Sequence, residues 1–268
     1  MSEPILSLHE IAVGYQGRVI QRQVSFEVRR GSIFAVMGGS GSGKSTLLRS
    51  MIGLLEPESG SMRFSGEDYW SADARKRDEI GRRFGVLFQS GALWSALTVG
   101  ENVALPMQMF TRMDDRTIER LVQLKLALVG LETAVELLPA QLSGGMAKRA
   151  GLARALALDP DMLFLDEPSS GLDPVTARRL DDLILDLREA TEVTIVLVSH
   201  DLPSLFAVAD DGVFLDVQAA TAIAHGSPSQ LRDQSTNPKV QAFMRREELE
   251  LPNSLPEEQR WKTRGRQF

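Results

Sequence analysis

The chain has 268 residues, of which 43% are hydrophobic and 25% are charged, proportions typical of a globular protein with a full core. Its formal net charge of −6 argues against a protein that coats nucleic acid, and the lack of cysteine excludes a disulfide scaffold and a thiolate metal site. The start, MSEPILSLHE, has no basic n-region and does not predict a signal peptide. No stretch holds the roughly 18 apolar residues that span a bilayer, so we expect a chain that is soluble by itself.

Strand patterns of two kinds occur along the chain. Short patterns separated by glycine-containing turns come first, at 7–15 and 24–30. Continuous apolar runs follow at 32–37, 161–167 and 193–200. These runs lack the alternation of a half-buried strand, which predicts parallel strands buried on both faces.

Helical patterns follow the apolar runs, at Lys44–Gly53, Val175–Ala190 and Pro203–Ala209. This alternation predicts an α/β fold in which helices cover a parallel sheet. Strand signals disappear between Gln89 and about Leu158, so we predict a mostly helical insertion at about 90–158. The last part, 236–268, is charged and interrupted by proline, and we interpret it as a C-terminal extension to a domain of residues 1–235.

The first apolar run leads into a glycine-rich segment that matches the pattern G-x-x-x-x-G-K-[ST]. The segment comprises Gly38, Gly39, Ser40, Gly41, Ser42, Gly43, Lys44, Ser45 and Thr46. Glycines let backbone amides curl around phosphate oxygens, and the helix that follows points its positive end at the same charge. Lys44 is expected to reach the β- and γ-phosphates of ATP, and the Ser45 hydroxyl to hold Mg²⁺.

The other two apolar runs end in Asp166-Glu167 and in His200. Taken alone, these are a solvated turn and a structural histidine, and the structural interpretation is kept for His9 and His225. Ligands bind beyond the carboxyl ends of parallel strands, so these side chains are expected at the same edge as Lys44. We predict that Asp166 supplies a carboxylate to Mg²⁺ and that Glu167 is the general base for an attacking water.

A helix predicted up to Leu158 begins at Ser143, Gly144 and Gly145, where two glycines cost stability that a simple cap does not require. This start is a second phosphate-facing helix end, which one nucleotide cannot easily share with the first. The hypothesis that resolves this is a head-to-tail homodimer. Each such helix end then closes over the ATP held by the other copy.

These motifs together resemble the ATP-binding subunits of ABC transporters over about residues 5–235. The resemblance rests on GGSGSGKS, LSGGM, MLFLDE, SSGLD and SH, which occur in the family's order. It implies a P-loop NTPase fold with a parallel-sheet core, an N-terminal antiparallel β subdomain and an inserted helical subdomain. It also implies ATP hydrolysis with ATP and Mg²⁺, with Glu167, His200 and Gln89 as catalytic residues.

Further roles are implied by the resemblance alone. Tyr15 corresponds to the aromatic residue that stacks on adenine, although a tyrosine packed on the core is the alternative. Gln89 corresponds to the glutamine that contacts Mg²⁺ and relays the nucleotide state to a membrane subunit. Asp173 corresponds to the aspartate that crosses the dimer interface. Met146 departs from the family's glutamine but leaves the glycine amides intact.

The segments FQSGALW, LTVGENVALP and LSGGMAKRAGLARALALDP resemble the ATPases of Mce-type and Mla-type lipid transporters. This resemblance implies a peripheral homodimer on the cytoplasmic face of the inner membrane, beneath a multi-spanning permease and an Mce-domain lipid-binding protein. Whether a small regulatory subunit binds the helical insertion is a question that the sequence leaves open. No nucleic-acid partner is implied. The form SSGLDP departs from some Mla ATPases.

Three alternatives remain from the sequence. One is an ABC ATPase for a non-lipid solute, the second is a non-transport ABC ATPase, and the third is a module that binds ATP without hydrolysing it. The basic residues of the C-terminal extension are interpreted either as a partner contact or as a solvated terminus. They are Arg260, Lys262, Arg264 and Arg266, with Trp261 among them. The partner-contact interpretation predicts that deleting 246–268 weakens assembly.

Overall fold

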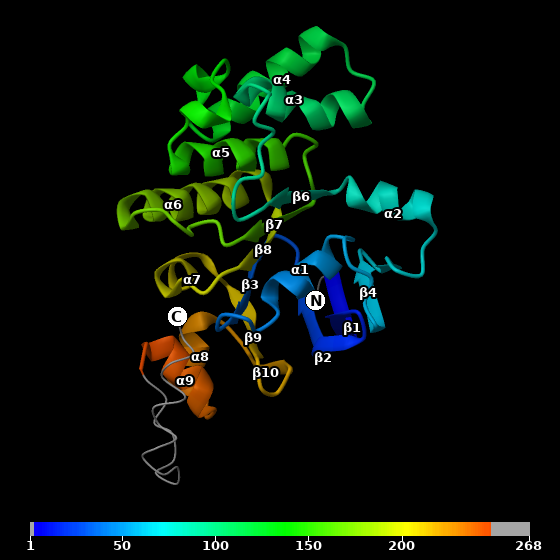
Figure 1. Ribbon diagram of the computed structural model, residues 1–268, viewed down its shortest axis with the longest axis vertical. Helices are drawn as coiled ribbons and strands as arrows, with labels where there is room; N and C mark the ends of the chain where they lie inside the picture. Colours follow the sequence, from blue (N-terminus) through cyan, green and yellow to red (C-terminus); the bar gives the residue numbers. More distant parts are fainter. Residues whose placement is uncertain (1–2, 248–268) are drawn as a thin grey trace.

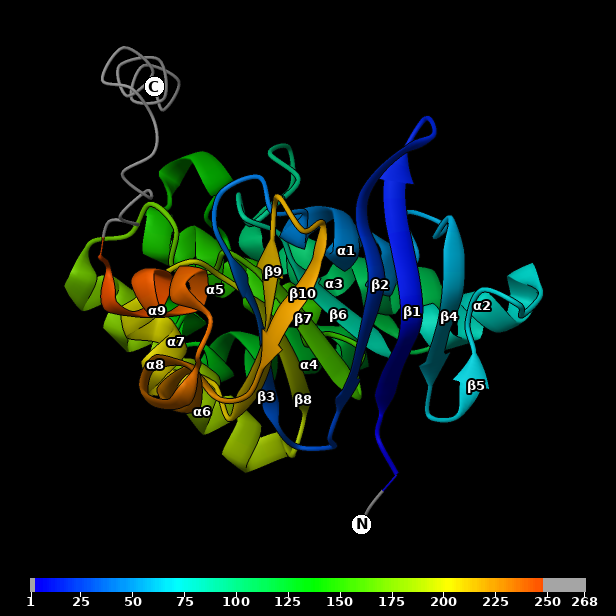
Figure 2. The same cartoon turned by 90° about the horizontal axis from the view of Figure 1, so that it is seen from below.

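The computed structural model describes residues 3–247, which form two sheets with helices between and around them (Figures 1 and 2). The strands are β1 (Leu6–Tyr15), β2 (Arg18–Val28), β3 (Ile33–Gly38), β4 (Ser59–Phe64), β5 (Glu67–Asp68), β6 (Phe84–Leu87), β7 (Met162–Asp166), β8 (Thr194–Val198), β9 (Asp211–Asp216) and β10 (Thr221–His225). The α-helices are α1 (Lys44–Met51), α2 (Ala74–Gly81), α3 (Val99–Phe110), α4 (Asp115–Leu128), α5 (Gly144–Ala155), α6 (Pro174–Thr191), α7 (Leu202–Val208), α8 (Pro228–Gln234) and α9 (Pro238–Arg245).

The central sheet has the strand order β10-β9-β3-β8-β7-β6, and every neighbouring pair is parallel except β10 with β9. All residues of β3 and β8 are buried, as the continuous apolar runs predicted. The expected parallel sheet covered by helices is therefore confirmed. The strands that end in the motif residues are β3, β8 and β7, which are neighbours inside this sheet.

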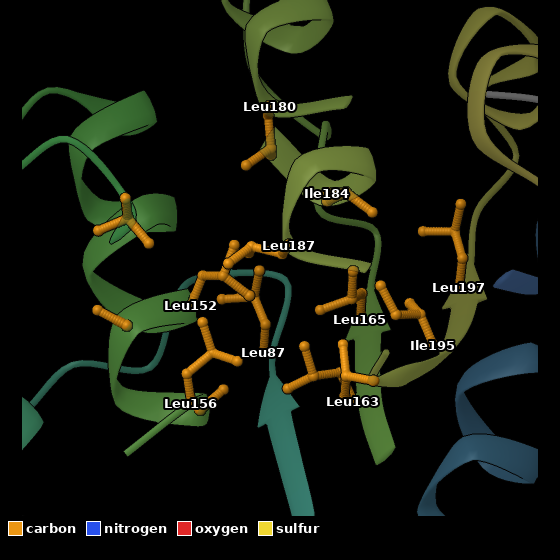
Figure 3. Packing of buried hydrophobic residues seen from close by; sticks show 14 of the residues in the cluster. Leu87, Leu152, Leu156, Leu163, Leu165, Leu180, Ile184, Leu187, Ile195 and Leu197 are labelled. Carbon is orange, nitrogen blue, oxygen red and sulfur yellow. The ribbon is translucent and has the colours of Figure 1, made fainter. Parts of the chain in front are cut away.

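The central sheet has a hydrophobic core on each face. On one face its side chains meet leucines and an isoleucine of α5 and α6 (Figure 3). The labelled residues there are Leu87, Leu152, Leu156, Leu163, Leu165, Leu180, Ile184, Leu187, Ile195 and Leu197. On the other face Phe34, Phe164 and Val196 pack with α1 and with the second sheet. Burial on both faces requires apolar residues at consecutive positions, which is why these strands were readable from the sequence.

The second sheet is antiparallel, with the order β2-β1-β4-β5, and confirms the expected N-terminal β subdomain. Helix α1 lies against both sheets, because Leu47 and Leu48 share one core with Leu6 of β1 and Phe34 of β3. The pattern at 24–30 located only the last part of β2, which begins at Arg18. The first residues of β2 are mostly exposed, so they carry little apolar signal.

Residues 90–158 contain α3, α4, α5 and two short 3-10 turns, and no strand occurs in this fully described range. They lie at the end of the molecule opposite α8 and α9 (Figure 1). The buried side chain of Asn102 accepts from the amide of Trp94 at 2.8 Å and donates to the carbonyls of Trp94 and Leu97 at 3.1 Å. These bonds fix the loop that joins β6 to α3.

The C-terminal extension predicted from residue 236 begins as a packed helix rather than as a tail. Val240, Ala242 and Met244 of α9 are buried, and Lys239 forms an ion pair with Asp216 of β9 at 2.9 Å. Packing therefore continues beyond the predicted boundary at 235. Trp261 and the basic residues around it lie outside the described residues. No helix within 3–247 has the length and apolar character needed to cross a membrane.

A buried carboxylate joins α6 to α7. Asp181 accepts a hydrogen bond from Ser204 Oγ at 2.9 Å. Burial raises the pKa of Asp181 from 3.8 to about 6, while the Ser204 hydrogen bond opposes the shift and Asp201 adds to it. Because the folded-state pKa is the higher one, the folded protein loses stability as pH rises from about 4 to 6.

We predict that Asp181→Asn raises the free energy of unfolding at pH 8 by about 1–3 kcal/mol, because the neutral amide accepts the same bond without a buried charge. The gain should shrink toward zero near pH 4. Urea unfolding of both proteins across this pH range measures it. A gain that is the same at pH 4 and pH 8 would show that Asp181 is not protonated preferentially in the fold.

Candidate functional site

The glycine-rich loop joins β3 to α1 in a backbone conformation that only glycine readily adopts. Gly38 has φ 144°, and a Cβ there would lie 2.5 Å from the carbonyl oxygen of Leu215. Gly43 has φ 86°, and a Cβ there would lie 2.7 Å from Cγ2 of Ile20. Gly43 also caps α1 without any side-chain hydrogen bond from the described part of the chain. The first amides of α1 are therefore left for another acceptor.

Lys44 is the first residue of α1, and its side chain turns back along the loop. Its Nζ donates to the carbonyl oxygens of Gly38 and Gly39 at 2.9 and 3.0 Å. Burial lowers the pKa of Lys44, and the negative charges of Glu167 and Asp166 oppose that shift. A buried ammonium next to two carboxylates is thus an intrinsic feature of this edge of the sheet. Ser45 and Thr46 follow in the first turn of α1.

Asp166 ends β7 and Glu167 follows it directly. Burial raises the pKa of Asp166, the charge of Glu167 adds to this, and Arg49, Lys44 and Lys148 oppose it. Asp166 Oδ1 and Glu167 Oε2 are buried and have no hydrogen-bond partner within residues 3–247. Carboxylate, hydroxyl and amide oxygens are the donors that Mg²⁺ prefers. The unpartnered oxygen of Asp166, together with the Ser45 hydroxyl in the first turn of α1 and the Gln89 amide oxygen just beyond β6, therefore fits the donor set of a magnesium ion.

Glu167 adopts φ 48°, a left-handed conformation that costs a non-glycine residue about 1–3 kcal/mol. Its amide donates to the carbonyl of Val198 in β8 at 2.8 Å, which holds the strained backbone in place. His200, just beyond β8, places Nδ1 2.7 Å from Glu167 Oε1. The structure thus brings Lys44, Asp166, Glu167 and His200 together, and strain at this point is typical of functional sites.

Gln89 and Tyr15 lie at the margins of this cluster. Gln89 follows β6, and its Nε2 donates to Ser170 Oγ at 3.3 Å. Tyr15 ends β1, is 39% exposed, and accepts a hydrogen bond from Arg49 of α1 at 2.8 Å. Its ring is therefore not packed in the core, which was the alternative to adenine stacking.

Ser143, Gly144, Gly145 and Asp173 lie at the starts of the neighbouring helices α5 and α6. Ser143 caps α5 by accepting from the amide of Met146 at 3.2 Å. Asp173 caps α6, and its hydrogen bonds with Thr176 lower its pKa. Ser143, Gly144 and Asp173 are solvent-exposed. Within residues 3–247 none of these residues forms a hydrogen bond to the glycine-rich loop.

The cluster around Lys44 is buried at Lys44 and Glu167 and exposed at His200. A hollow of about 720 Å³ is found at the opposite edge, where β3, β7 and β8 begin, between Lys125, Asp159 and Arg188. That hollow contains none of the predicted site residues.

Two residues next to the cluster were missed from the sequence. Gln21 of β2 is fully buried, and its Nε2 donates to the carbonyl of Ser42 at 2.7 Å and to that of Asp216 at 3.1 Å. Lys148 of α5 is buried and donates to the carbonyls of Gln89 and Glu167. Gln21 carries no sequence signal. Lys148 shares a helix face with Gly151 and Leu152, and that apolar spacing was the available signal.

Comparisons with known proteins agree with this geometry. The family described as ABC transporter matches residues 21–170. The intermembrane phospholipid transport system ATP-binding protein MlaF of Haemophilus influenzae is 39% identical over 247 residues, which cover 92% of each chain. The probable ribonucleotide transport ATP-binding protein mkl of Mycobacterium bovis is 43% identical over 72% of this chain and 54% of its own length.

A solved structure, the dimeric ATP-binding cassette MJ0796 bound to ADP and Pi in a post-hydrolysis state, matches with a TM-score of 0.74 and 28% identity. The match covers 82% of this chain and 97% of that chain. The family match spans more than half of this chain, and the relative from Haemophilus influenzae extends it to nearly the whole length. The chain belongs to the ABC transporter family, as a subunit that hydrolyses ATP.

Proposed function

We propose that this chain powers the movement of phospholipid, or another lipid, between membranes, as a homodimer on the cytoplasmic face of the inner membrane. The observation that carries the proposal is the similarity to the phospholipid transport protein MlaF, which covers 92% of both chains. The similarity to the ribonucleotide transport protein mkl favours a solute transporter as the second candidate. The similarity to mkl covers only 54% of that protein, so it is weaker support than the similarity to MlaF.

In the proposed site, the triphosphate of ATP lies on the glycine-rich loop. The free amides at the start of α1 donate to its oxygens, and Lys44 turns from the loop carbonyls to the β- and γ-phosphates. This exchange costs little, because the phosphates replace carbonyl oxygens as acceptors for the same ammonium. Tyr15, which is hydrogen-bonded to Arg49 of α1, offers an exposed ring for adenine.

Ser45, Gln89 and Asp166 would hold Mg²⁺, which neutralises charge on the phosphates when bound. Glu167 accepts a proton from the attacking water as general base. Its strained backbone and its contact with His200 fix the direction of the carboxylate. His200 is the more exposed partner in this pair and thus the group nearer to the open side of the site.

The second half of each site comes from another copy of the chain. The backbone amides of Gly144 and Gly145, with Ser143, would meet the γ-phosphate held by the partner's loop, and Asp173 would contact the partner beside them. The dimeric form of the related cassette MJ0796 supports this arrangement. ATP then forms part of the interface, and the two copies separate after hydrolysis, when the products leave.

The helical insertion is the surface proposed to receive the permease. Trp94, which precedes α3, is 63% exposed, and Met109, Phe110 and Met113 are exposed at the end of α3 and just after it. Exposed large apolar side chains of this kind mark contact surfaces. They lie on the segment that follows Gln89, so a change at the nucleotide reaches them directly. An Mce-domain lipid-binding protein completes the proposed assembly, with no nucleic-acid partner.

The first prediction concerns Glu167. Glu167→Gln should bind ATP yet hydrolyse it at least about 100-fold more slowly, because the amide cannot accept the proton. ATP-dependent dimers should then accumulate, as measured by light scattering together with phosphate release. Glu189→Gln, an exposed glutamate at the end of α6, is the control. Full hydrolysis by Glu167→Gln would remove Glu167 from the mechanism.

The second prediction concerns Lys44. Lys44→Ala should weaken ATP binding about 10- to 100-fold, because charge-assisted hydrogen bonds to the phosphates are lost. Calorimetric titration with ATP measures this. Lys76→Ala removes a lysine paired with Glu67 at 2.7 Å on the surface, and should bind as the unaltered protein does. Unchanged affinity in Lys44→Ala would contradict the phosphate-loop assignment.

The lipid assignment is tested by purifying the tagged chain from native membranes in mild detergent, with mass spectrometry of proteins and lipids. A multi-spanning permease, an Mce-domain protein and phospholipid are expected. Recovery of a different permease together with a soluble solute-binding protein would show that the transported substrate is a solute and not a lipid. The same experiment reveals any small regulatory subunit, and absence of every membrane protein would contradict the transport role.

A further inference from the structure

One lysine of α5 lies inside the protein instead of at its surface. Lys148 is 6% exposed and lies on the buried face of α5, next to Gly151 and Leu152. Its Nζ donates to the carbonyl oxygen of Gln89 and, at 3.2 Å, to that of Glu167. A single ammonium therefore connects α5 to the backbone just beyond two neighbouring strands, β6 and β7.

The loop after β6 lies directly on α5. A Cβ at Gly151 would be 3.0 Å from the carbonyl oxygen of Gly91, so any larger residue would require the loop to move away from the helix. Arg154, further along α5, donates to the carbonyls of Gly91 and Ala92 at 3.1 and 2.7 Å. Loop 89–92 and α5 are thus held as a unit. Of these two basic side chains, Lys148 is the one that extends the unit to Glu167.

The bond to Glu167 acts on a strained residue. The backbone of Glu167 has φ 48°, its amide is held by Val198, and its carbonyl accepts from Lys148 and from the amide of Ser170. The direction of the Glu167 side chain toward His200 depends on this conformation. A displacement of about 1 Å at a catalytic group can cost about 100-fold in rate.

We propose that Lys148 is a positioning residue for ATP hydrolysis, which holds the backbone of Glu167 and Gln89 on the helix whose start faces the partner's ATP. It touches neither the nucleotide nor the attacking water. Its removal therefore lowers the rate of hydrolysis and leaves ATP binding to the glycine-rich loop intact. This role rests on the ATP hydrolysis assigned to the same site.

The test compares Lys148→Met with Lys148→Arg in the full-length chain. In Lys148→Met, kcat should fall about 10- to 100-fold, while KM and the Kd for ATP change less than about threefold. Lys148→Arg retains donors and charge and should restore most of kcat. Amide hydrogen exchange of residues 88–92 and 167–170 should accelerate in Lys148→Met only, which reports the loss of positioning directly.

Lys125→Met is the matched control. Lys125 is 4% exposed, lies in the same helical insertion and is paired with Asp159, near the opposite edge of the sheet. Its loss removes a buried ammonium without touching the site, and kcat should stay unchanged. Equal losses of kcat in both methionine variants would overturn the proposal, because they would report only a destabilised fold.

Lys148→Gln covers the case in which Lys148→Met does not fold. Glutamine keeps a shorter, neutral donor, so at equal thermal stability its kcat should lie below that of Lys148→Arg. Equal kcat in the unaltered chain and in the arginine and glutamine variants would contradict the role. An unaltered chain that binds ATP but never hydrolyses it, even with its membrane partners, would instead overturn the ATPase assignment and this role with it.

Discussion

The burial of opposite charges at one edge of the parallel sheet is the constraint on which the rest of the site depends. Lys44, Lys148 and Asp166 each lose hydration there. Burial therefore lowers the pKa of the two lysines and raises that of Asp166, which in each case favours the neutral form. The attraction of the two lysines to Asp166 and Glu167 opposes this cost, whereas the repulsion between the two carboxylates adds to it. Such a cluster is stable only if every member is held in place, and the strands and glycines provide that fixation.

The same constraint explains the unusual backbone around the cluster. Gly38 and Gly43 adopt conformations that bring the loop close to Leu215 and Ile20, and Glu167 keeps a left-handed conformation beside Val198. These backbone conformations cost stability locally. The burial of apolar side chains in the two cores that enclose β3, β7 and β8 offsets this cost. In the proposed function, a second copy of the chain completes the exposed side of the cluster.

The central strands and the motif residues were predictable because each rests on local signals. β3, β7 and β8 are continuous apolar runs, and Lys44 stands in a glycine pattern with a direct chemical meaning. Lys148 and Gln21 were not predicted, because their partners lie 59 and 21 residues away and only the folded chain brings them together. The helix α9 was hidden within a charged segment whose few apolar residues face the core.

The central claim is that ATP joins two copies, with the start of α5 in one facing the glycine-rich loop of the other. Because the chain lacks cysteine, a disulfide cross-link tests this directly. Ser40→Cys and Ser143→Cys can be combined in one Glu167→Gln chain. The account predicts a disulfide-linked dimer that forms with ATP and Mg²⁺ and far less with ADP. Bound ATP without cross-linked dimers, or equal cross-linking without nucleotide, would contradict it.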